Sequence, residues 1–309
     1  MSKYRNSLPW GEASLFLCYV GLETDLMFNQ GFELPGFASY PLLNDEKGRA
    51  ALWDSYRDQI ALAREYGTGL QLDSATWMAN RDRAAVIDVS PEEVLQANRD
   101  ALAILSEARD AFGDCPTILS ANVGTRSDAY APAERMSVEE AEEYHAEQIS
   151  VIAETEADIV TAMTLSYPEE AAGIVRACRR YGLPVVVSFT VETDGHLPTG
   201  GSLPDAIALV DETTEGYAEH FLINCAHPEH FADILEEGSD WMQRVRGVIA
   251  NASRCSHAEL DEAEELDDGN PVELGQQLNA LRNRFPQFLT MGGCCGTDLR
   301  HMAQIAKKA

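Results

Sequence analysis

Short apolar segments alternate with longer amphipathic segments along this chain, and the alternation repeats eight times. The apolar segments are rich in β-branched residues, as in Val185-Val186-Val187, and such continuous runs are typical of parallel strands covered on both faces. The pattern therefore restricts the chain to an α/β architecture with a largely parallel sheet. The strands are expected at residues 14–21, 69–76, 117–124, 158–164, 184–192, 220–226, 245–253 and 288–294.

Helix start signals lie between the expected strands. Ser90 and Glu93 form a capping box with a proline at the first helical position, and Ser137 and Glu140 form a second box. In a capping box, the two side chains satisfy backbone N–H groups that the first turn of a helix leaves unpaired. The helices are expected at residues 47–66, 90–112, 137–154, 168–181, 203–211, 228–237, 271–284 and 298–307.

Eight strand–helix units in 309 residues are the number that a (β/α)8 TIM barrel needs. We therefore predict a TIM barrel that forms a single domain over residues 1–309. A doubly wound open sheet is the second candidate. The sequence contains neither a GxGxxG nor a GxxxxGK[ST] phosphate loop, which disfavours that alternative.

The chain is strongly acidic, with 51 Asp and Glu residues against 23 Lys and Arg and a formal net charge of −28. Such a surface repels phosphate backbones and anionic lipids, so neither a nucleic acid nor a membrane is expected as a partner. The first ten residues lack the apolar core of a secretion signal. Seven cysteines, an odd number in a long chain, are not typical of a disulfide framework. We therefore expect a cytoplasmic protein with reduced thiols.

The segment 291–297, Met-Gly-Gly-Cys-Cys-Gly-Thr, is the most informative feature for function. Neighbouring residues of a regular strand point to opposite faces, so Cys294 and Cys295 reach one metal only if the backbone turns there. The adjacent glycines provide the freedom for such a turn. Cys225 ends the sixth expected strand on the same barrel face, and three thiolates of this kind suit zinc with one position open. Three buried thiols without a metal are the less favoured alternative.

These cysteine motifs resemble those of the homocysteine S-methyltransferase family, the zinc-thiolate barrels that include betaine– and S-methylmethionine–homocysteine methyltransferases. Segment 292–297 matches the C-terminal zinc motif of that family, and Ile223-Asn224-Cys225 matches its upstream zinc-ligand motif. The resemblance covers roughly residues 14–307 and implies a barrel that holds Zn2+ through Cys225, Cys294 and Cys295. Weaker similarities lie at 21–26, 142–149 and 187–203.

Two carboxylates that hold the amino group of homocysteine in this family are missing here. Tyr19 stands where the family has an aspartate at the end of the first strand, and Met163 stands where it has a glutamate at the end of the fourth. An ammonium group that leaves water needs a compensating charge, so the departures predict weak recognition of homocysteine. Glu23, Asp73 and Glu192, all near strand ends, are the candidate substitutes.

The residues at the ends of the first, third and fourth strands are expected to bind the substrate. This interpretation combines the barrel geometry with the resemblance. Aromatic side chains near the same opening suit a cationic methyl donor through cation–π contacts, with Tyr19, Trp77 and Tyr130 as candidates. The expected substrate contacts are Tyr19, Gly21, Leu22, Glu23, Asn122, Gly124, Met163 and Thr164.

The expected activity is zinc-dependent methyl transfer from a small sulfonium or ammonium donor to a thiol acceptor, with homocysteine giving methionine. We expect the donor to be small or to be delivered by a separate corrinoid protein. One alternative is the same chemistry on another thiol, or demethylation of a sulfur compound. Another is a zinc-thiolate protein without catalysis. The sequence leaves the oligomeric state open.

Overall fold

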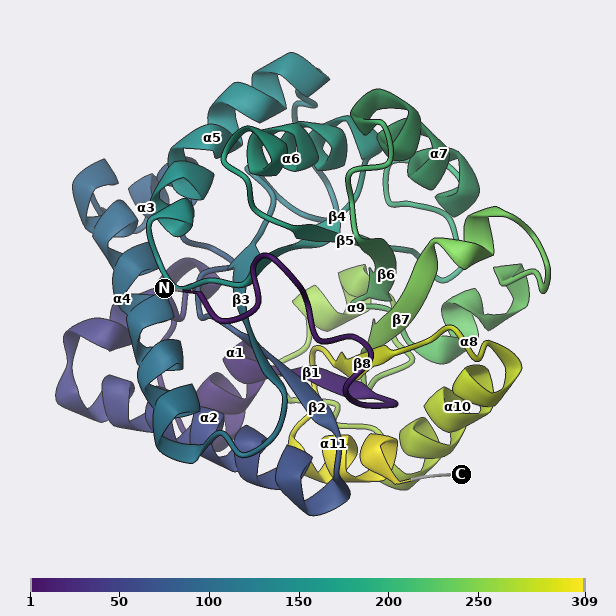
Figure 1. The fold of residues 1–309 in the computed structure, drawn as a ribbon, viewed down its shortest axis with the longest axis horizontal. Coiled ribbons are helices and arrows are strands. Elements are labelled where there is room, and N and C mark those ends of the chain that lie inside the picture. Colours follow the sequence, from purple (N-terminus) through teal and green to yellow (C-terminus); the bar gives the residue numbers. More distant parts are fainter. Residues whose placement is uncertain (1, 308–309) are drawn as a thin grey trace.

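The computed structural model describes residues 2–307, in which eight parallel strands close into a barrel in chain order (Figure 1). The predicted TIM barrel is confirmed, and the open sheet is wrong because β1 pairs with both β2 and β8. The strands are β1 (Phe16–Val20), β2 (Gly69–Asp73), β3 (Thr117–Val123), β4 (Ile159–Leu165), β5 (Val185–Thr190), β6 (His220–Asn224), β7 (Val245–Ala250) and β8 (Thr290–Gly293).

Helices surround the barrel, and all eight expected helices are present (Figure 1). Both predicted capping boxes form, at Ser90 with Glu93 and at Ser137 with Glu140. The helices are α1 (Leu22–Thr24), α2 (Glu46–Tyr66), α3 (Arg81–Val86), α4 (Pro91–Phe112), α5 (Val138–Ala153), α6 (Pro168–Arg180), α7 (Leu203–Thr214), α8 (Pro228–Phe231), α9 (His257–Asp261), α10 (Pro271–Arg284) and α11 (Leu299–Ala306).

Three short helices, α1, α3 and α9, were not expected from the sequence. They follow β1, β2 and β7, and at three to six residues they are too short to show an apolar period. Two elements are shorter than predicted. The last strand, β8, begins only at Thr290, and the helix expected at 228–237 ends at Phe231. Within the described residues, no helix combines the length and apolar character of a membrane span.

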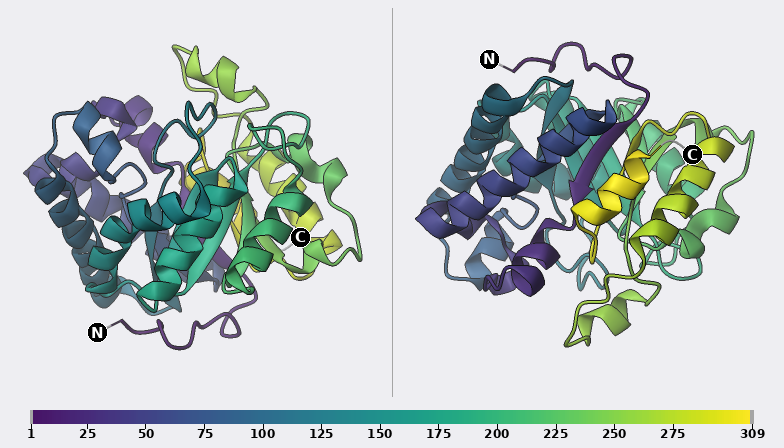
Figure 2. Two further views of the ribbon diagram at one scale, coloured as in Figure 1. Left: turned by 90° about the horizontal axis from the view of Figure 1, so that it is seen from above. Right: turned by 90° about the horizontal axis from the view of Figure 1, so that it is seen from below.

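The two ends of the barrel differ. The N-terminal segment crosses one end, where Tyr4 N–H donates to Asp158 and Trp10 packs edge-on against Phe16. Figure 2 shows the yellow-green segment around α9 standing out at the opposite end, where the strands finish. The carboxyl ends of the strands therefore remain free of the N-terminal segment, and they carry the candidate site.

Barrel closure depends on close backbone contact between β7, β8 and β1. Side chains have no room at two glycines: a Cβ atom on Gly247 would overlap the carbonyl of Thr290, and one on Gly292 would overlap the carbonyl of Cys18. β7 and β1 are the two neighbours of β8 in the sheet. The glycines thus allow the last strand to pair on both sides.

We expect Gly247→Ala to lower the free energy of unfolding by about 1–3 kcal/mol, because the added methyl group forces β7 away from β8. Urea unfolding followed by circular dichroism measures this difference. Gly201→Ala is the matched control, since its added Cβ would lie 3.7 Å from Leu197 in ordinary contact. Equal stability of the two variants would contradict the steric argument.

Candidate active site

Three cysteine thiols meet at the carboxyl ends of the strands. Cys225 follows β6, whereas Cys294 and Cys295 follow β8, and β7 pairs with both of these strands. The three sulfur atoms all lie within 4.8 Å of one another. The convergence that the sequence predicted from two strand ends is therefore present in the fold.

The backbone turns sharply where the thiols meet. Cys225 has a φ of 53° and Gly296 a φ of 78°, both in the left-handed region. Gly292 and Gly293 do not have positive φ, so conformational freedom is not what they contribute. A side chain on Gly293 would instead overlap Thr297, whose hydroxyl donates to the carbonyl of Cys294 at 2.7 Å. The sequence-based argument about glycine freedom is thus correct only for Gly296.

Non-glycine residues with left-handed backbone gather at this site. Tyr19 near the end of β1 has a φ of 43°, and Thr164 near the end of β4 has a φ of 64°. Each such residue costs of order 1–3 kcal/mol, which surrounding contacts must offset. Asn224 supplies these contacts: its Oδ1 accepts from the N–H of Thr164 at 3.1 Å, and its Nδ2 donates to Thr164 Oγ1 at 2.7 Å and to Cys225 Sγ at 3.3 Å.

A second set of side chains fixes the carbonyl of Cys225. Asn251 Nδ2 donates to it at 3.0 Å, and His257 Nε2 lies 2.6 Å from it. His257 Nδ1 faces Glu192 at 3.2 Å, so Glu192 orients this histidine and does not reach the substrate cavity. The sequence analysis missed His257, which lies on the short helix α9 more than 30 positions from Cys225. The capping box of Ser256 and Glu259, which opens this helix, is the signal that could have revealed it.

The thiols influence one another's ionisation. Hydrogen bonds from Cys294 and Cys295 lower the pKa of Cys225 well below its usual value, although burial opposes this shift. The pKa values of Cys294 and Cys295 are raised well above the usual value, first by their hydrogen bonds to Cys225. Ionisation of one thiol therefore disfavours ionisation of the other two.

This donor set fits zinc. Three sulfur ligands from a compact cluster match the thiolate sites that zinc prefers, and its double positive charge would offset the repulsion among three thiolates. The thiols also line a cavity of about 230 Å³, which leaves space beside them for a further ligand. A closed structural site with four protein ligands does not have this opening.

Five of the eight expected substrate contacts line this cavity, namely Tyr19, Gly21, Glu23, Met163 and Thr164. The structure places the other three elsewhere. Leu22 lines a different cavity, shared with residues of α2 and α11. Asn122 is fully buried and directs its amide toward the sulfur of Met163 at 3.8 Å, and Gly124 packs against the carbonyl of Trp77. Neighbouring groups thus cover Asn122 and Gly124, whereas Leu22 faces another cavity.

Glu23 is the only one of the three candidate substitute carboxylates that lines the cavity. Its Oε1 accepts from Ser39 Oγ at 2.8 Å, and its Oε2 accepts from the hydroxyl of Tyr19. Burial raises the pKa of Glu23, and these hydrogen bonds oppose the shift. Asp73 lies away from the cavity and accepts from Gln71, and burial raises its pKa to about 7.

Aromatic and acidic side chains complete the wall. Tyr19, Trp77 and Tyr130 all line the cavity, as the sequence-based hypothesis of cation–π contacts requires. The sequence analysis missed Phe37, which also lines it and packs edge-on against Trp77 with ring centroids 6.2 Å apart. The ring of Tyr130 stacks on His257 at 4.0 Å. Such a wall suits a cation that carries methyl groups.

Sequence and structure comparisons agree on the family. The model of the family described as homocysteine S-methyltransferase matches residues 71–309. The oxidised form of the homocysteine methyltransferase MmuM from Escherichia coli superposes with a TM-score of 0.72 at 18% identity, covering 96% of both chains. The metallated form of the same enzyme gives a TM-score of 0.71 at 17% identity, again with 96% of both chains covered. No curated protein matches the chain.

The structural likeness establishes the fold, and the match of the family model over most of the sequence establishes the family. The chain belongs to the homocysteine S-methyltransferase family and is an S-methyltransferase.

Proposed function

We propose that the protein transfers a methyl group from a small sulfonium or ammonium donor to the thiol of homocysteine, giving methionine, and that it uses Zn2+. One observation carries the proposal: three sulfur atoms lie within 4.8 Å of one another on the wall of a cavity that also contains a buried carboxylate and several aromatic rings. In this proposal residues 1–309 form one catalytic domain in a reducing cytoplasm, an environment that keeps free thiols reduced.

Cys225, Cys294 and Cys295 are the residues that would hold the zinc ion. When bound, zinc would stabilise the acceptor as a thiolate at neutral pH, where a free thiol is mostly protonated. The buried hydrogen bonds of Asn224, Asn251 and the turn at Thr297 keep the three sulfur atoms in place before any ligand arrives. Preorganisation of this kind limits the cost of ordering the site.

Recognition of the acceptor falls to Glu23 in this proposal. Glu23 lies in the cavity wall and the residue is 3% exposed, so an ammonium group beside its carboxylate would be shielded from water. The carboxylates that the family has at positions 19 and 163 are absent, but Glu23 supplies a negative charge in the same cavity. This placement supports homocysteine as acceptor, against the weak recognition that the sequence comparison suggested.

The donor would lie against the aromatic wall. Trp77, Tyr130 and Phe37 line the cavity, and the faces of such rings attract a sulfonium or quaternary ammonium group. The acceptor sulfur attacks the methyl carbon as the bond from that carbon to the donor's sulfur or nitrogen breaks, and the leaving group departs with the electron pair. The acceptor's thiol proton passes to solvent. Alignment of the two reactants in one cavity would provide much of the rate enhancement.

Two alternatives predict different products. Transfer to another thiol or demethylation of a sulfur compound would retain the zinc chemistry and change the acceptor, whereas a non-catalytic zinc protein would transfer nothing. Incubation of zinc-loaded protein with S-methylmethionine or betaine and a panel of thiols separates these cases. Methionine formed from homocysteine supports the proposal. Methylation of other thiols alone supports the first alternative. If no thiol is methylated, the proposed function is contradicted.

We expect Cys294→Ala to lose stoichiometric zinc and methyl transfer while the barrel remains folded, because two sulfur ligands hold zinc far less tightly than three. Metal analysis after dialysis and an assay of methionine formation provide the two measurements. Cys178→Ala removes a buried thiol on α6, remote from the cluster, and serves as the control with full zinc content. Retention of activity in zinc-free Cys294→Ala would refute the zinc assignment.

Gly293→Val is expected to reduce zinc content although all three cysteines remain. The new side chain would collide with Thr297, whose hydrogen bond to the carbonyl of Cys294 shapes the turn. Metal analysis and circular dichroism together test this expectation. A folded Gly293→Val protein with a full complement of zinc would show that the turn tolerates the collision.

Glu23→Gln should raise the KM for homocysteine by roughly 10- to 100-fold, since a hydrogen bond to a charged group contributes about 1.5–3 kcal/mol. The matched control is Asp25→Asn, whose carboxylate lies on the same segment but accepts from Asn29 at 2.8 Å and does not line the cavity. Steady-state kinetics with varied homocysteine measure the effect. An unchanged KM in Glu23→Gln would exclude Glu23 as the amino-group anchor.

A further inference from the structure

Arg83 on α3 brings a positive charge to the wall of the thiol cavity. The other charged residues of this wall are the acids Glu23, Asp128 and Asp261. Within residues 2–307, Arg83 is the only basic residue that lines the cavity. An anionic group that enters the cavity therefore has one cation available to it.

The guanidinium group of Arg83 is incompletely satisfied. Its Nη2 donates to the carbonyl of Ser127, but its buried Nε has no hydrogen-bond partner in the described part of the chain. Among the ion pairs between described residues, none includes Arg83. Asp128 is close enough to affect its ionisation, but Asp128 Oδ1 already accepts from the N–H groups of Tyr130 and Ala131, both at 2.8 Å.

An unpaired charge in a half-buried position is costly, because part of its hydration is lost without a compensating anion. In proteins such a group is commonly part of a binding site, because an anionic ligand then supplies the missing interaction. A planar guanidinium suits a carboxylate in particular, because two of its N–H groups form parallel hydrogen bonds to the two carboxylate oxygens.

The position of Arg83 is fixed by contacts around α3. Asn80 caps the helix by accepting from the N–H of Arg83 at 3.1 Å, and the hydroxyl of Tyr144 on α5 donates to the same oxygen at 2.9 Å. The carboxylate of Asp82 accepts from Arg126 Nε at 2.7 Å, and the N–H of Arg126 donates to Glu170 on α6 at 2.7 Å. The short helix is thus attached to the loop after β3 and to two neighbouring helices.

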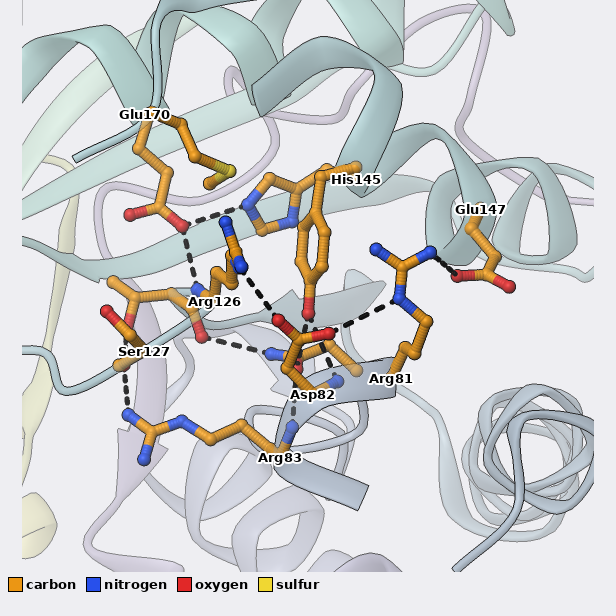
Figure 3. Close-up of polar contacts among 12 residues, drawn as sticks. Arg81, Asp82, Arg83, Arg126, Ser127, His145, Glu147 and Glu170 are labelled. Atoms are coloured by element: carbon orange, nitrogen blue, oxygen red, sulfur yellow. Dashed lines mark hydrogen bonds and ion pairs between the residues drawn. The ribbon is translucent and has the colours of Figure 1, made fainter. Parts of the chain in front are cut away.

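Figure 3 shows that Arg81 and Arg83, the two arginines of α3, point in opposite directions. Arg81 reaches toward Glu147 on α5, with which it forms an ion pair at 3.5 Å. Arg83 reaches toward Ser127, on the side of the helix that lines the cavity. The same helix therefore carries one paired arginine outside the site and one unpaired arginine within it.

We propose that Arg83 binds the carboxylate of an amino-acid substrate in this cavity. The inference rests on the proposed function and extends it: Glu23 would hold the ammonium group, and Arg83 would hold the carboxylate. A wall with one buried acid and one unpaired base selects molecules that carry both charges. Homocysteine and an amino-acid donor such as S-methylmethionine both have this chemistry, so the experiment must distinguish them.

Calorimetry on the zinc-loaded protein tests the proposal without turnover. Methionine and methioninol have the same amino group and thioether, but methioninol lacks the carboxylate. The wild type should bind methionine roughly 10- to 100-fold more tightly than methioninol, and Arg83→Gln should lose this preference. Arg81→Gln is the control and should keep it. Arg83→Lys, which retains the charge, should keep part of the preference if Arg83→Gln does not fold.

Steady-state kinetics then identify which substrate presents the carboxylate. A raised KM for homocysteine in Arg83→Gln assigns the contact to the acceptor, and a raised KM for S-methylmethionine assigns it to the donor. Equal binding of methionine and methioninol by the wild type would overturn the proposal, and so would an equal loss of both ligands in Arg83→Gln, which indicates a purely structural role. The proposed function is tested separately, because wild-type methyl transfer to a thiol does not depend on either result.

Discussion

Closure of the barrel between β8 and its two neighbours is the constraint on which the rest of the structure depends. The last strand pairs with β7 on one side and β1 on the other, and glycines at 247 and 292 permit the close approach of the backbones. This pairing places the residues after β8 beside those after β6 and β1. Pairing with β7 brings Cys294 and Cys295 close to Cys225, and pairing with β1 adds Tyr19 and Gly21 to the same cavity.

The site is a compact arrangement of groups that are individually unfavourable. Left-handed backbone at Tyr19, Thr164 and Cys225, a buried carboxylate at Glu23 and three crowded thiols all cost free energy in the unliganded protein. Hydrogen bonds from buried polar side chains and the packing of the surrounding barrel offset these costs. A rigid barrel suits this purpose, because each strand end is fixed by ladders on both sides.

Charge balance links the groups of the cavity to one another. The thiols cannot all ionise without a cation, since the ionised Cys225 raises the pKa values of Cys294 and Cys295. The acids that line the cavity, Glu23, Asp128 and Asp261, favour cationic groups, whereas Arg83 provides the opposite charge. A divalent metal ion, a cationic methyl donor and a zwitterionic amino acid each meet a complementary part of this wall.

The sequence by itself determined the barrel, its eight strand–helix units and the cysteines that meet, because apolar periodicity, capping boxes and the glycine–cysteine motif are local signals. It did not reveal α3 or α9, and it therefore missed Arg83 and His257, which reach the site from short segments without periodicity. It also named Leu22, Asn122 and Gly124 as substrate contacts, but none of the three lines the thiol cavity, and Leu22 lines another one. Only the tertiary structure decided that Glu23, and not Asp73 or Glu192, faces the cavity, because the direction of a side chain beyond a strand end depends on packing between distant segments.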